Sequence, residues 1–275
     1  MRRMAIASQE VNFGLIGFGR IGRRVFERLA TDATGPKLTA VLVRSDQRQR
    51  AEASVGPDRV CTSLEGFIAR RSNVVVECAS QEALNAYAGP VLAAGSDLIP
   101  LSLSAFADRN VEASLTAAAT AGFGRLEIPA GAIGSLDVLA AAREDELIGV
   151  VFRAAFPVAR WRGTAAEAMT RLDDVTNRMT FFRGTVRDIA RLFPRHLNVS
   201  VGVALAGLGL DRTAAELIAD PELKQAQFEI DISAGPGPVS IRVDGRDVAL
   251  GADPVDYTTF SVLRLLRRRQ ARVMI

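Results

Sequence analysis

The segment GLIGFGRIGRR constrains the fold of this chain more than any other part of its 275 residues. It contains Gly17, Gly19 and Gly22 in the spacing G-x-G-x-x-G. These glycines lie where an apolar run at 11–18 ends and an amphipathic run at 22–32 begins. The apolar run predicts a buried strand and the amphipathic run predicts a helix. In the turn from a strand to a helix, this spacing is typical of a site for the pyrophosphate of a dinucleotide.

The three glycines have separate roles in such a turn. Gly17 permits the tight bend, Gly19 lets the phosphates approach the backbone, and Gly22 lets the helix pack on the strand. Arg20 and Ile21 lie between Gly19 and Gly22 of the loop, and we expect all these residues to contact the cofactor. The alternative is a glycine-rich turn that binds no ligand.

The first half of the chain alternates apolar runs with helical patterns. Strands are predicted at 11–18, 38–44, 73–80, 96–104 and 125–131, and helices at 22–32, 63–71, 82–95 and 111–122. The strands are apolar throughout, which is typical of a parallel sheet covered on both faces. Residues 1–138 are therefore predicted to form an α/β domain with a Rossmann-type doubly wound parallel sheet.

The pattern changes near residue 140. Alternation of apolar and polar residues predicts antiparallel strands with one solvated face at 148–156, 213–220, 227–234 and 239–246. Helices are predicted at 201–209 and 258–270. We expect residues 139–256 to form an α+β domain with a mostly antiparallel sheet, for substrate binding and dimerisation. Residues 257–275 are expected to form a C-terminal helix that packs back on the first domain.

The end of the second predicted strand, VLVRSDQRQR, bears on the choice of cofactor. An NAD-specific sheet usually ends this strand with an acidic residue that accepts hydrogen bonds from the ribose. Here Arg44 and Ser45 stand where a 2′-phosphate would lie, which favours NADP over NAD. The alternative is that Asp46 serves the ribose of NAD. The ends of two later strands, CAS at 78–80 with Ala79 and Ser80 and SLS at 102–104, are predicted to line the groove for the nicotinamide ribose.

The composition argues against several classes of function. Cys61, Cys78 and a single histidine are too few for a disulfide framework or a zinc cluster, so no metal is expected. No apolar run approaches the roughly 18 residues that cross a bilayer, and no signal peptide is expected, which favours a cytoplasmic protein without a membrane partner. The net charge of +3 comes from scattered arginines, and the dense run at 264–272 is typical of a solvated helix end. We therefore expect no nucleic-acid partner.

Several segments follow one another in an order that covers nearly the whole chain. They are GFGRIGRRV, VVVECAS, AGSDLI, AGAIGSLD, WRGTAAE, FPRHLNVSVGVALAGLGLDRT and IADP. Together they resemble the L-aspartate dehydrogenase family. The resemblance implies oxidative deamination of L-aspartate through iminosuccinate with NAD or NADP, a Rossmann domain with a second domain on an antiparallel sheet, and a homodimer. It also implies that Ala132 contacts the cofactor and that Asn198 lies at the nicotinamide.

The catalytic segment departs from the family pattern. Members that resemble this chain carry Asn-x-His shortly after the ADP triplet, and that histidine is the catalytic group. Here Ala226 and Phe228 stand at these positions, and Gln81 stands where the family often has a histidine. The family's Asn-Pro-Lys-Thr-Ser becomes DPVDY at 253–257, which loses the lysine and both hydroxyls. Because a benzene ring cannot transfer a proton, the aspartate reaction is not expected to carry over intact.

His196, in the segment RLFPRHLNVSVG, is the only histidine in the sequence. Hydride transfer between an amino acid and a nicotinamide needs a proton carrier with a pKa of about 7, which suits an imidazole. His196 lies two residues before Asn198 and is our candidate catalytic residue; the alternative is an ordinary polar residue. Trp161 is predicted to be a packing residue. Other candidate proton carriers are Glu229, Asp231, Asp256 and Tyr257.

Three functions remain open at this point. The first is an NAD(P)-dependent oxidoreductase that acts on a small molecule, an amino acid or its imine, and whose substrate can differ from aspartate. The second is a reductase in which Phe228 and Tyr257 form a more apolar pocket. The third is a protein that binds NADP(H) without catalysis, such as a redox sensor or an interaction subunit. The third function predicts tight binding of NADPH and no turnover.

Overall fold

The computed structural model describes residues 10–134, 136–194, 197–245 and 257–273. Its strands are β1 (Asn12–Ile16), β2 (Lys37–Leu42), β3 (Val60–Cys61), β4 (Val74–Glu77), β5 (Asp97–Pro100), β6 (Leu147–Phe156), β7 (Met179–Thr185), β8 (Ala214–Ala219), β9 (Gln227–Ala234) and β10 (Val239–Asp244). Its α-helices are α1 (Arg20–Ala30), α2 (Arg48–Val55), α3 (Leu64–Ile68), α4 (Gln81–Ala93), α5 (Arg109–Ala121), α6 (Leu136–Ala142), α7 (Val186–Leu192), α8 (Asn198–Ala206) and α9 (Tyr257–Arg268).

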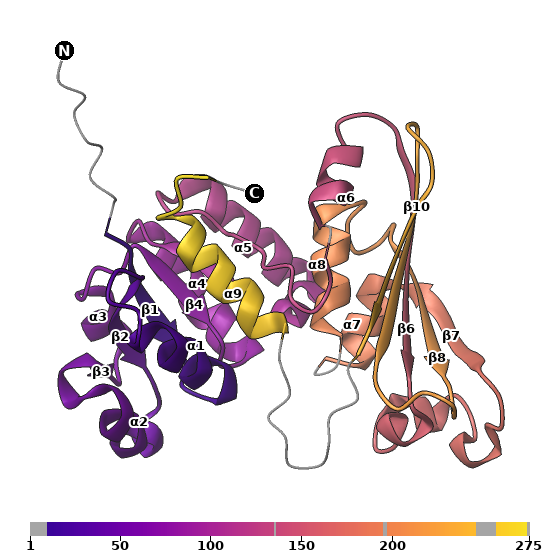
Figure 1. Ribbon diagram of the computed structural model, residues 1–275, viewed down its shortest axis with the longest axis horizontal. Helices are drawn as coiled ribbons and strands as arrows, with labels where there is room; N and C mark the ends of the chain where they lie inside the picture. The colour runs from indigo at the N-terminus through magenta and orange to yellow at the C-terminus, as the bar shows by residue number, and fades with distance from the viewer. Residues whose placement is uncertain (1–9, 135, 195–196, 246–256, 274–275) are drawn as a thin grey trace. The chain divides into compact units, whose positions relative to one another are not determined.

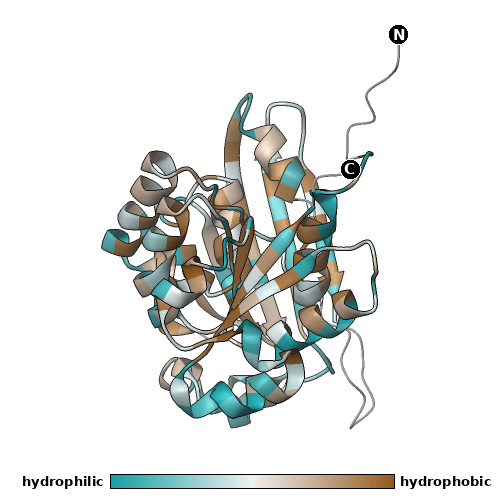
Figure 2. Cartoon of the chain, turned by 90° about the vertical axis from the view of Figure 1, so that its left-hand side faces the viewer, coloured by the Kyte–Doolittle hydropathy of each residue, from teal (hydrophilic) through white to brown (hydrophobic). Residues whose placement is uncertain are grey.

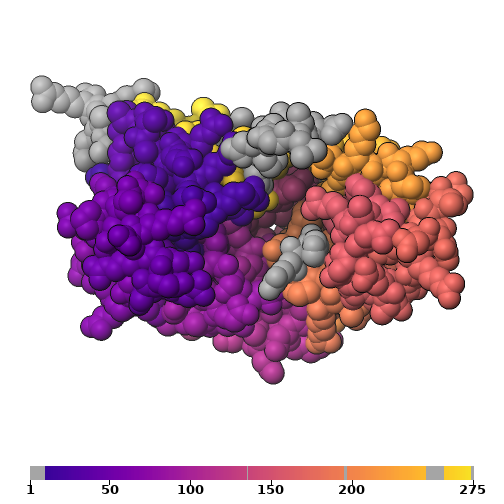
Figure 3. All heavy atoms as spheres, turned by 90° about the horizontal axis from the view of Figure 1, so that it is seen from below, coloured from indigo at the N-terminus to yellow at the C-terminus, as the bar shows by residue number. Residues whose placement is uncertain are grey.

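The chain forms two compact units (Figure 1). Unit 1 comprises Met1–Ser102, Asn110–Pro129 and Thr258–Ile275, and unit 2 comprises Leu103–Arg109 and Ala130–Tyr257. In the space-filling view of Figure 3, most of the indigo to magenta residues and the yellow residues belong to unit 1, and the red and orange residues belong to unit 2. The chain passes from unit 1 to unit 2 directly after Ser102, just beyond the carboxyl end of β5.

Unit 1 contains a parallel sheet in the order β3-β2-β1-β4-β5. The order reverses at β1, because β2 and β3 lie on one side of this strand and β4 and β5 on the other. Ligands of such sheets bind outside the carboxyl ends of the strands, beside the point of reversal. The parallel pairing and the alternation of strands with helices confirm the Rossmann-type prediction for this part of the chain.

Apolar side chains of α1, α2 and α9 cover one face of this sheet. The strands contribute residues such as Phe13, Leu15 and Val76 to the buried cluster, and α9 contributes Val262 and Leu266. In Figure 2 the strands are brown in the interior, whereas teal residues lie on the outer helices. The C-terminal helix therefore belongs to the core of unit 1, because its amphipathic face replaces solvent over the sheet.

One predicted strand of unit 1 is wrong. Residues 125–131 form only an isolated bridge, Leu98 to Leu126, and not a further strand. The backbone N–H of Leu98 donates to Arg125 (2.7 Å), and the N–H of Glu127 donates to Leu98 (2.8 Å). Pro129 follows two residues later and has no N–H to continue the ladder.

Unit 2 contains a mixed sheet in the order β10-β9-β6-β8-β7. Its pairs β10·β9, β9·β6 and β8·β7 are antiparallel, which confirms the prediction of a mostly antiparallel sheet. The pair β6·β8 is parallel, although each of these strands also has an antiparallel neighbour, β9 and β7 respectively. The connection between them includes β7, α7 and α8, and it is long enough to return the chain to the same end of the sheet. The sequence did not predict β7.

The two faces of this second sheet differ in polarity, because successive side chains of a strand point to opposite faces. Phe152 and Ile230 are completely buried. On the other face Arg153 donates from Nε to Glu216 (2.8 Å) and also pairs with Asp231. The outward face of β6 and β9 is therefore held by ion pairs, and the inward face forms the core of unit 2.

None of the helices in the described ranges combines the length and the apolar character needed to cross a membrane. Over the same ranges, no cluster of three or more His, Cys, Asp or Glu side chains is arranged to hold a metal ion.

Candidate functional site

The glycine loop lies between β1 and α1, at the carboxyl edge of the parallel sheet. Gly17 has φ +92°, a backbone conformation that L side chains rarely adopt, and a Cβ there would lie 2.8 Å from the Cβ of Ala79. A Cβ at Gly22 would lie 2.8 Å from the carbonyl oxygen of Gly17. The thiol of Cys78 donates to the same carbonyl oxygen (3.3 Å). Two of the glycines are therefore required by the close packing of the loop itself.

Gly19 differs from the other two glycines. It has φ −79°, which any residue can adopt, and a Cβ there would meet no heavy atom within 4 Å. It precedes α1 without a side-chain cap, and no acidic residue lies in the first turn of this helix. The first N–H groups of a helix have no partner within the helix and carry the positive end of its dipole. An open cradle beside such donors suits a pyrophosphate, so the residues present fit the predicted cofactor.

The predicted specificity residues lie at the carboxyl end of β2. Arg44 and Ser45 are exposed, and Arg44 forms a loose surface ion pair with Asp46 at 3.4 Å. An exposed pair at this distance contributes little to stability, so the guanidinium can turn to another anion without a large cost.

A buried carboxylate that sequence analysis missed lies at the end of β4. Glu77 is completely buried, and its Oε1 accepts from the N–H of Ala79 (2.7 Å), the N–H of Ser80 (3.0 Å) and the hydroxyl of Ser102 (3.0 Å). Its Oε2 accepts from the N–H groups of Leu101 (3.3 Å) and Ser102 (3.1 Å). Burial raises the pKa of Glu77, and these hydrogen bonds act in the opposite direction. The signal in the sequence is a charged residue that ends an apolar run.

In unit 2, Asn198 is the first residue of α8 and holds the segment that follows β5. Its Oδ1 accepts from the backbone N–H of Ser104 (2.8 Å) and from the Ser104 hydroxyl (2.7 Å). Because a backbone N–H can only donate, these contacts fix which amide atom faces Ser104. The amide nitrogen of Asn198 is then the atom available to donate to a ligand.

Arg187 also holds the segment that follows β5. Its buried guanidinium donates to the carbonyl groups of Phe106 and Ala107. Sequence analysis did not predict this contact.

Phe228, at the position of the family histidine, lies in an aromatic cluster. Its ring centroid is 6.0 Å from that of Phe152 and 5.8 Å from that of Phe156. Trp161 continues the cluster at 4.9 Å from Phe156, is buried, and donates from Nε1 to the carbonyl of Ile218 (3.0 Å). This environment confirms Trp161 as a packing residue and gives position 228 an apolar surrounding.

Two of the other candidate proton carriers, Glu229 and Asp231, do not lie on the same face of β9 as Phe228. Glu229 and Asp231 are paired with cations, at 3.6 Å from Arg178 and beside Arg153 respectively. Glu229 and Asp231 lie on the face of β9 opposite to that of Phe228, because successive residues of a strand point to opposite faces. The Ser240 hydroxyl and the Arg153 guanidinium lower the pKa of Asp231, which makes it a poor proton donor at neutral pH.

The remaining candidate site residues lie at the ends of helices, in a turn or outside the described ranges. His196 and Asp256 lie outside the described residues. Tyr257 begins α9 and is exposed. Ala132 lies, half-buried, in the turn before α6, and Gln81 is the first residue of α4.

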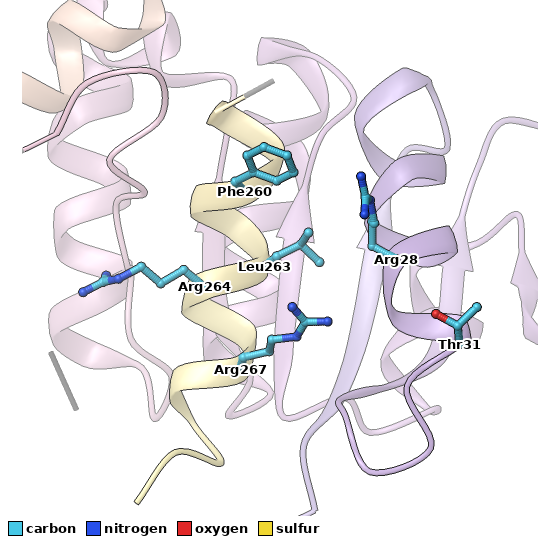
Figure 4. Close-up of a pocket in the computed structure, with 6 residues that line it drawn as sticks. All are labelled: Arg28, Thr31, Phe260, Leu263, Arg264 and Arg267. Atoms are coloured by element: carbon cyan, nitrogen blue, oxygen red, sulfur yellow. The ribbon is translucent and has the colours of Figure 1, made fainter. Parts of the chain in front are cut away.

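A surface pocket of about 470 Å³ lies in unit 1 between α1 and α9 (Figure 4). It is lined by Arg28, Thr31, Phe260, Leu263, Arg264 and Arg267. Arg28 lies in the last turn of α1, whereas the glycine loop precedes the first turn. The pocket is therefore separate from the candidate dinucleotide site.

Two family models match the chain, one over each half. The NAD binding domain of homoserine dehydrogenase matches residues 17–129, which begin at the first glycine of the loop. The C-terminal domain of aspartate dehydrogenase matches residues 137–269.

Curated relatives and solved structures agree with these matches. The L-aspartate dehydrogenase of Cupriavidus necator is 34% identical over 271 residues, which are 96% of this chain and 100% of the relative. That of Pseudomonas aeruginosa is 35% identical over 260 residues, 93% of this chain and 96% of the relative. The structure of aspartate dehydrogenase from Thermotoga maritima superimposes with a TM-score of 0.75 at 22% identity and covers 97% of this chain and 99% of that one. The chain belongs to the L-aspartate dehydrogenase family.

Proposed function

We propose that this dehydrogenase uses NADP(H) in preference to NAD(H) and acts on an amino acid or its imine that is not L-aspartate. The change of substrate is carried by one observation: Phe228 packs against Phe152 and Phe156 at the position of the family histidine, beside a complete glycine loop. The exposed Arg44 and Ser45 after β2 support the preference for NADP. The curated relatives named L-aspartate dehydrogenase support an amino-acid substrate.

In this proposal each unit has a defined task. The first turn of α1 and Gly19 would hold the pyrophosphate, and the amide nitrogen of Asn198 is the proposed donor to the nicotinamide end. A nicotinamide held there would supply the acceptor or donor of the hydride. Phe228 and its aromatic neighbours exclude water and present an apolar wall to the substrate. The proton is left to another group, for which His196 remains the candidate.

The function is tested by assays in both directions. L-aspartate with NADP, and oxaloacetate with ammonia and NADPH, are expected to give little turnover. A screen of other amino acids and keto acids is expected to identify a substrate with a less polar side chain. Rapid turnover of L-aspartate would contradict the proposed change of substrate. Tight NADPH binding with no turnover of any substrate would instead favour a non-catalytic binding protein, for which the apolar setting of Phe228 also argues.

The preference for NADP is tested at Arg44. Arg44→Asp is expected to weaken NADPH binding at least about tenfold and to leave NADH binding the same or tighter, because a hydrogen bond to a charged group contributes about 1.5–3 kcal/mol. Equilibrium titration with both reduced cofactors measures the effect. Arg28→Asp makes the same change of charge at the far end of α1 and serves as the control. Equal losses for NADPH and NADH in Arg44→Asp would contradict the preference.

The role of Asn198 is tested by Asn198→Asp. A carboxylate can still accept from the N–H and hydroxyl of Ser104, but it replaces the amide donor by a second acceptor. We expect NADPH binding to weaken about tenfold with little change in Tm, since a hydrogen bond to the cofactor is lost and the internal ones are kept. Asn198→Ala, the comparison variant, is expected to lower Tm as well. Unchanged binding in Asn198→Asp would remove the amide nitrogen from the site.

Two further expectations belong to this proposal. The family resemblance supports a homodimer, which light scattering on the purified chain would test. A cytoplasmic location is likewise proposed, and fractionation of the source cells would test it.

A further inference from the structure

The buried carboxylate of Glu77 connects the ends of two neighbouring strands. It accepts from Ala79 and Ser80, which directly follow β4, and from Leu101 and Ser102, which directly follow β5. Burial of a carboxylate is costly unless hydrogen bonds replace its hydration, and here donors reach both oxygens. The carboxylate is buried even though the three preceding residues of the strand, Val74, Val75 and Val76, are apolar and buried.

The donors to Glu77 lie where a ligand of this sheet would bind. Parallel sheets bind ligands outside the carboxyl ends of their strands, beside the point at which the strand order reverses, and here that point lies between β1 and β4. Ala79 also forms the wall against Gly17, since a Cβ at Gly17 would lie 2.9 Å from the Cα of Ala79. A shift of the segment after β4 would therefore change the shape of the glycine loop.

We propose that Glu77 is a positioning residue for the nicotinamide half of the dinucleotide. The inference rests on the proposed dinucleotide site. In that site the adenosine half lies on the side of β2, where Arg44 is, and the nicotinamide half lies on the side of β4 and β5. Glu77 is completely buried and does not touch the cofactor. It acts by holding the main chain at Ala79–Ser80 and Leu101–Ser102 in one conformation.

Glu77→Gln is the variant that tests this role. The amide keeps the size of the side chain, but its NH₂ group faces backbone N–H donors that now lack an acceptor. We expect NADPH to bind at least about tenfold more weakly, whereas adenosine 2′,5′-bisphosphate, which contains only the adenosine half, changes by less than about twofold. In the free protein, the amides on the side of the new NH₂ group, either those of Ala79 and Ser80 or that of Ser102, are expected to exchange hydrogen faster.

Ser102→Ala is the matched milder variant. It removes the hydroxyl donor to Oε1 and leaves the N–H of Ser102 in place, so the charge of Glu77 keeps its other donors. We expect a smaller loss of NADPH affinity in the same direction, with no change for adenosine 2′,5′-bisphosphate. This variant carries the test if Glu77→Gln does not fold.

The outcomes separate this inference from the function on which it rests. Equal losses for NADPH and adenosine 2′,5′-bisphosphate would assign Glu77 a general structural role and overturn the inference, as would unchanged NADPH binding in both variants. If the wild-type protein bound neither ligand, the proposed function would fail first.

Discussion

Gly19→Val is expected to weaken NADPH binding about 100-fold while Tm stays within about 2 °C of the wild-type value. The backbone at Gly19 has φ −79°, and a Cβ there meets no atom of the free protein within 4 Å, so the fold has space for a side chain to begin at this position. A bound pyrophosphate would occupy the same space. Loss of one or two charge-assisted hydrogen bonds, at about 1.5–3 kcal/mol each, accounts for the size of the effect.

Two further variants make this result specific. Gly89→Val introduces the same side chain at another glycine with open space around it, in α4, and is expected to leave NADPH binding unchanged. Gly17→Ala forces a Cβ against Ala79 at φ +92° and is expected to lower both Tm and binding. Fluorescence titration with NADPH and thermal melting measure both quantities. Wild-type affinity in Gly19→Val would show that no ligand approaches this part of the loop.

The combination of Ala226→Asn with Phe228→His is expected to create oxidation of L-aspartate at least about 100-fold faster than in the unchanged chain. A positioned acid or base typically contributes about 10²–10⁴-fold. Phe228 is half-buried, and loss of its ring contacts costs about 0.5–1.5 kcal/mol each, which a folded domain can tolerate. The gain is expected in kcat, because DPVDY at 253–257 still lacks the family's lysine and leaves KM high.

The pH profile distinguishes a catalytic histidine from a repacked pocket. Activity of the double variant is expected to rise with pH through an inflection at or below the ordinary histidine pKa of about 6.5, since the deprotonated imidazole is the base and the apolar surrounding of position 228 disfavours the charged form. Phe228→Leu opens a similar space without a proton carrier, and no gain is expected. A double variant that folds and binds NADPH but does not oxidise L-aspartate would contradict the reasoning that Phe228 replaces the catalytic group.

The sequence predicts local features of this fold well. Most helices and strands of unit 1 follow from hydrophobic periodicity within short windows, whereas α2 and β3 were not predicted; Gly17 follows from the conformation that the turn requires. The pairing of β6 with β8 is not local, so alternation in each strand could not reveal that they run parallel. β7 was missed because its residues are half-buried or exposed without a regular alternation.

The candidate site was predicted in part for the same reason. The glycine loop is contiguous in the sequence, so its chemistry can be read directly. The contacts of Glu77 reach 25 residues along the chain to Ser102, and those of Asn198 reach 94 residues to Ser104. Side chains that act through such distant partners become visible only when the fold brings the partners together.

A calorimetric titration of the purified chain with NADPH and with NADH tests the central claim most directly. The claim is that the backbone N–H groups after β1 bind the pyrophosphate of a nicotinamide dinucleotide. We expect saturable binding at one site per chain, tighter for NADPH than for NADH and competed by adenosine 2′,5′-bisphosphate. A folded protein that releases or absorbs no binding heat with either cofactor, and whose Tm neither cofactor raises, would contradict the claim.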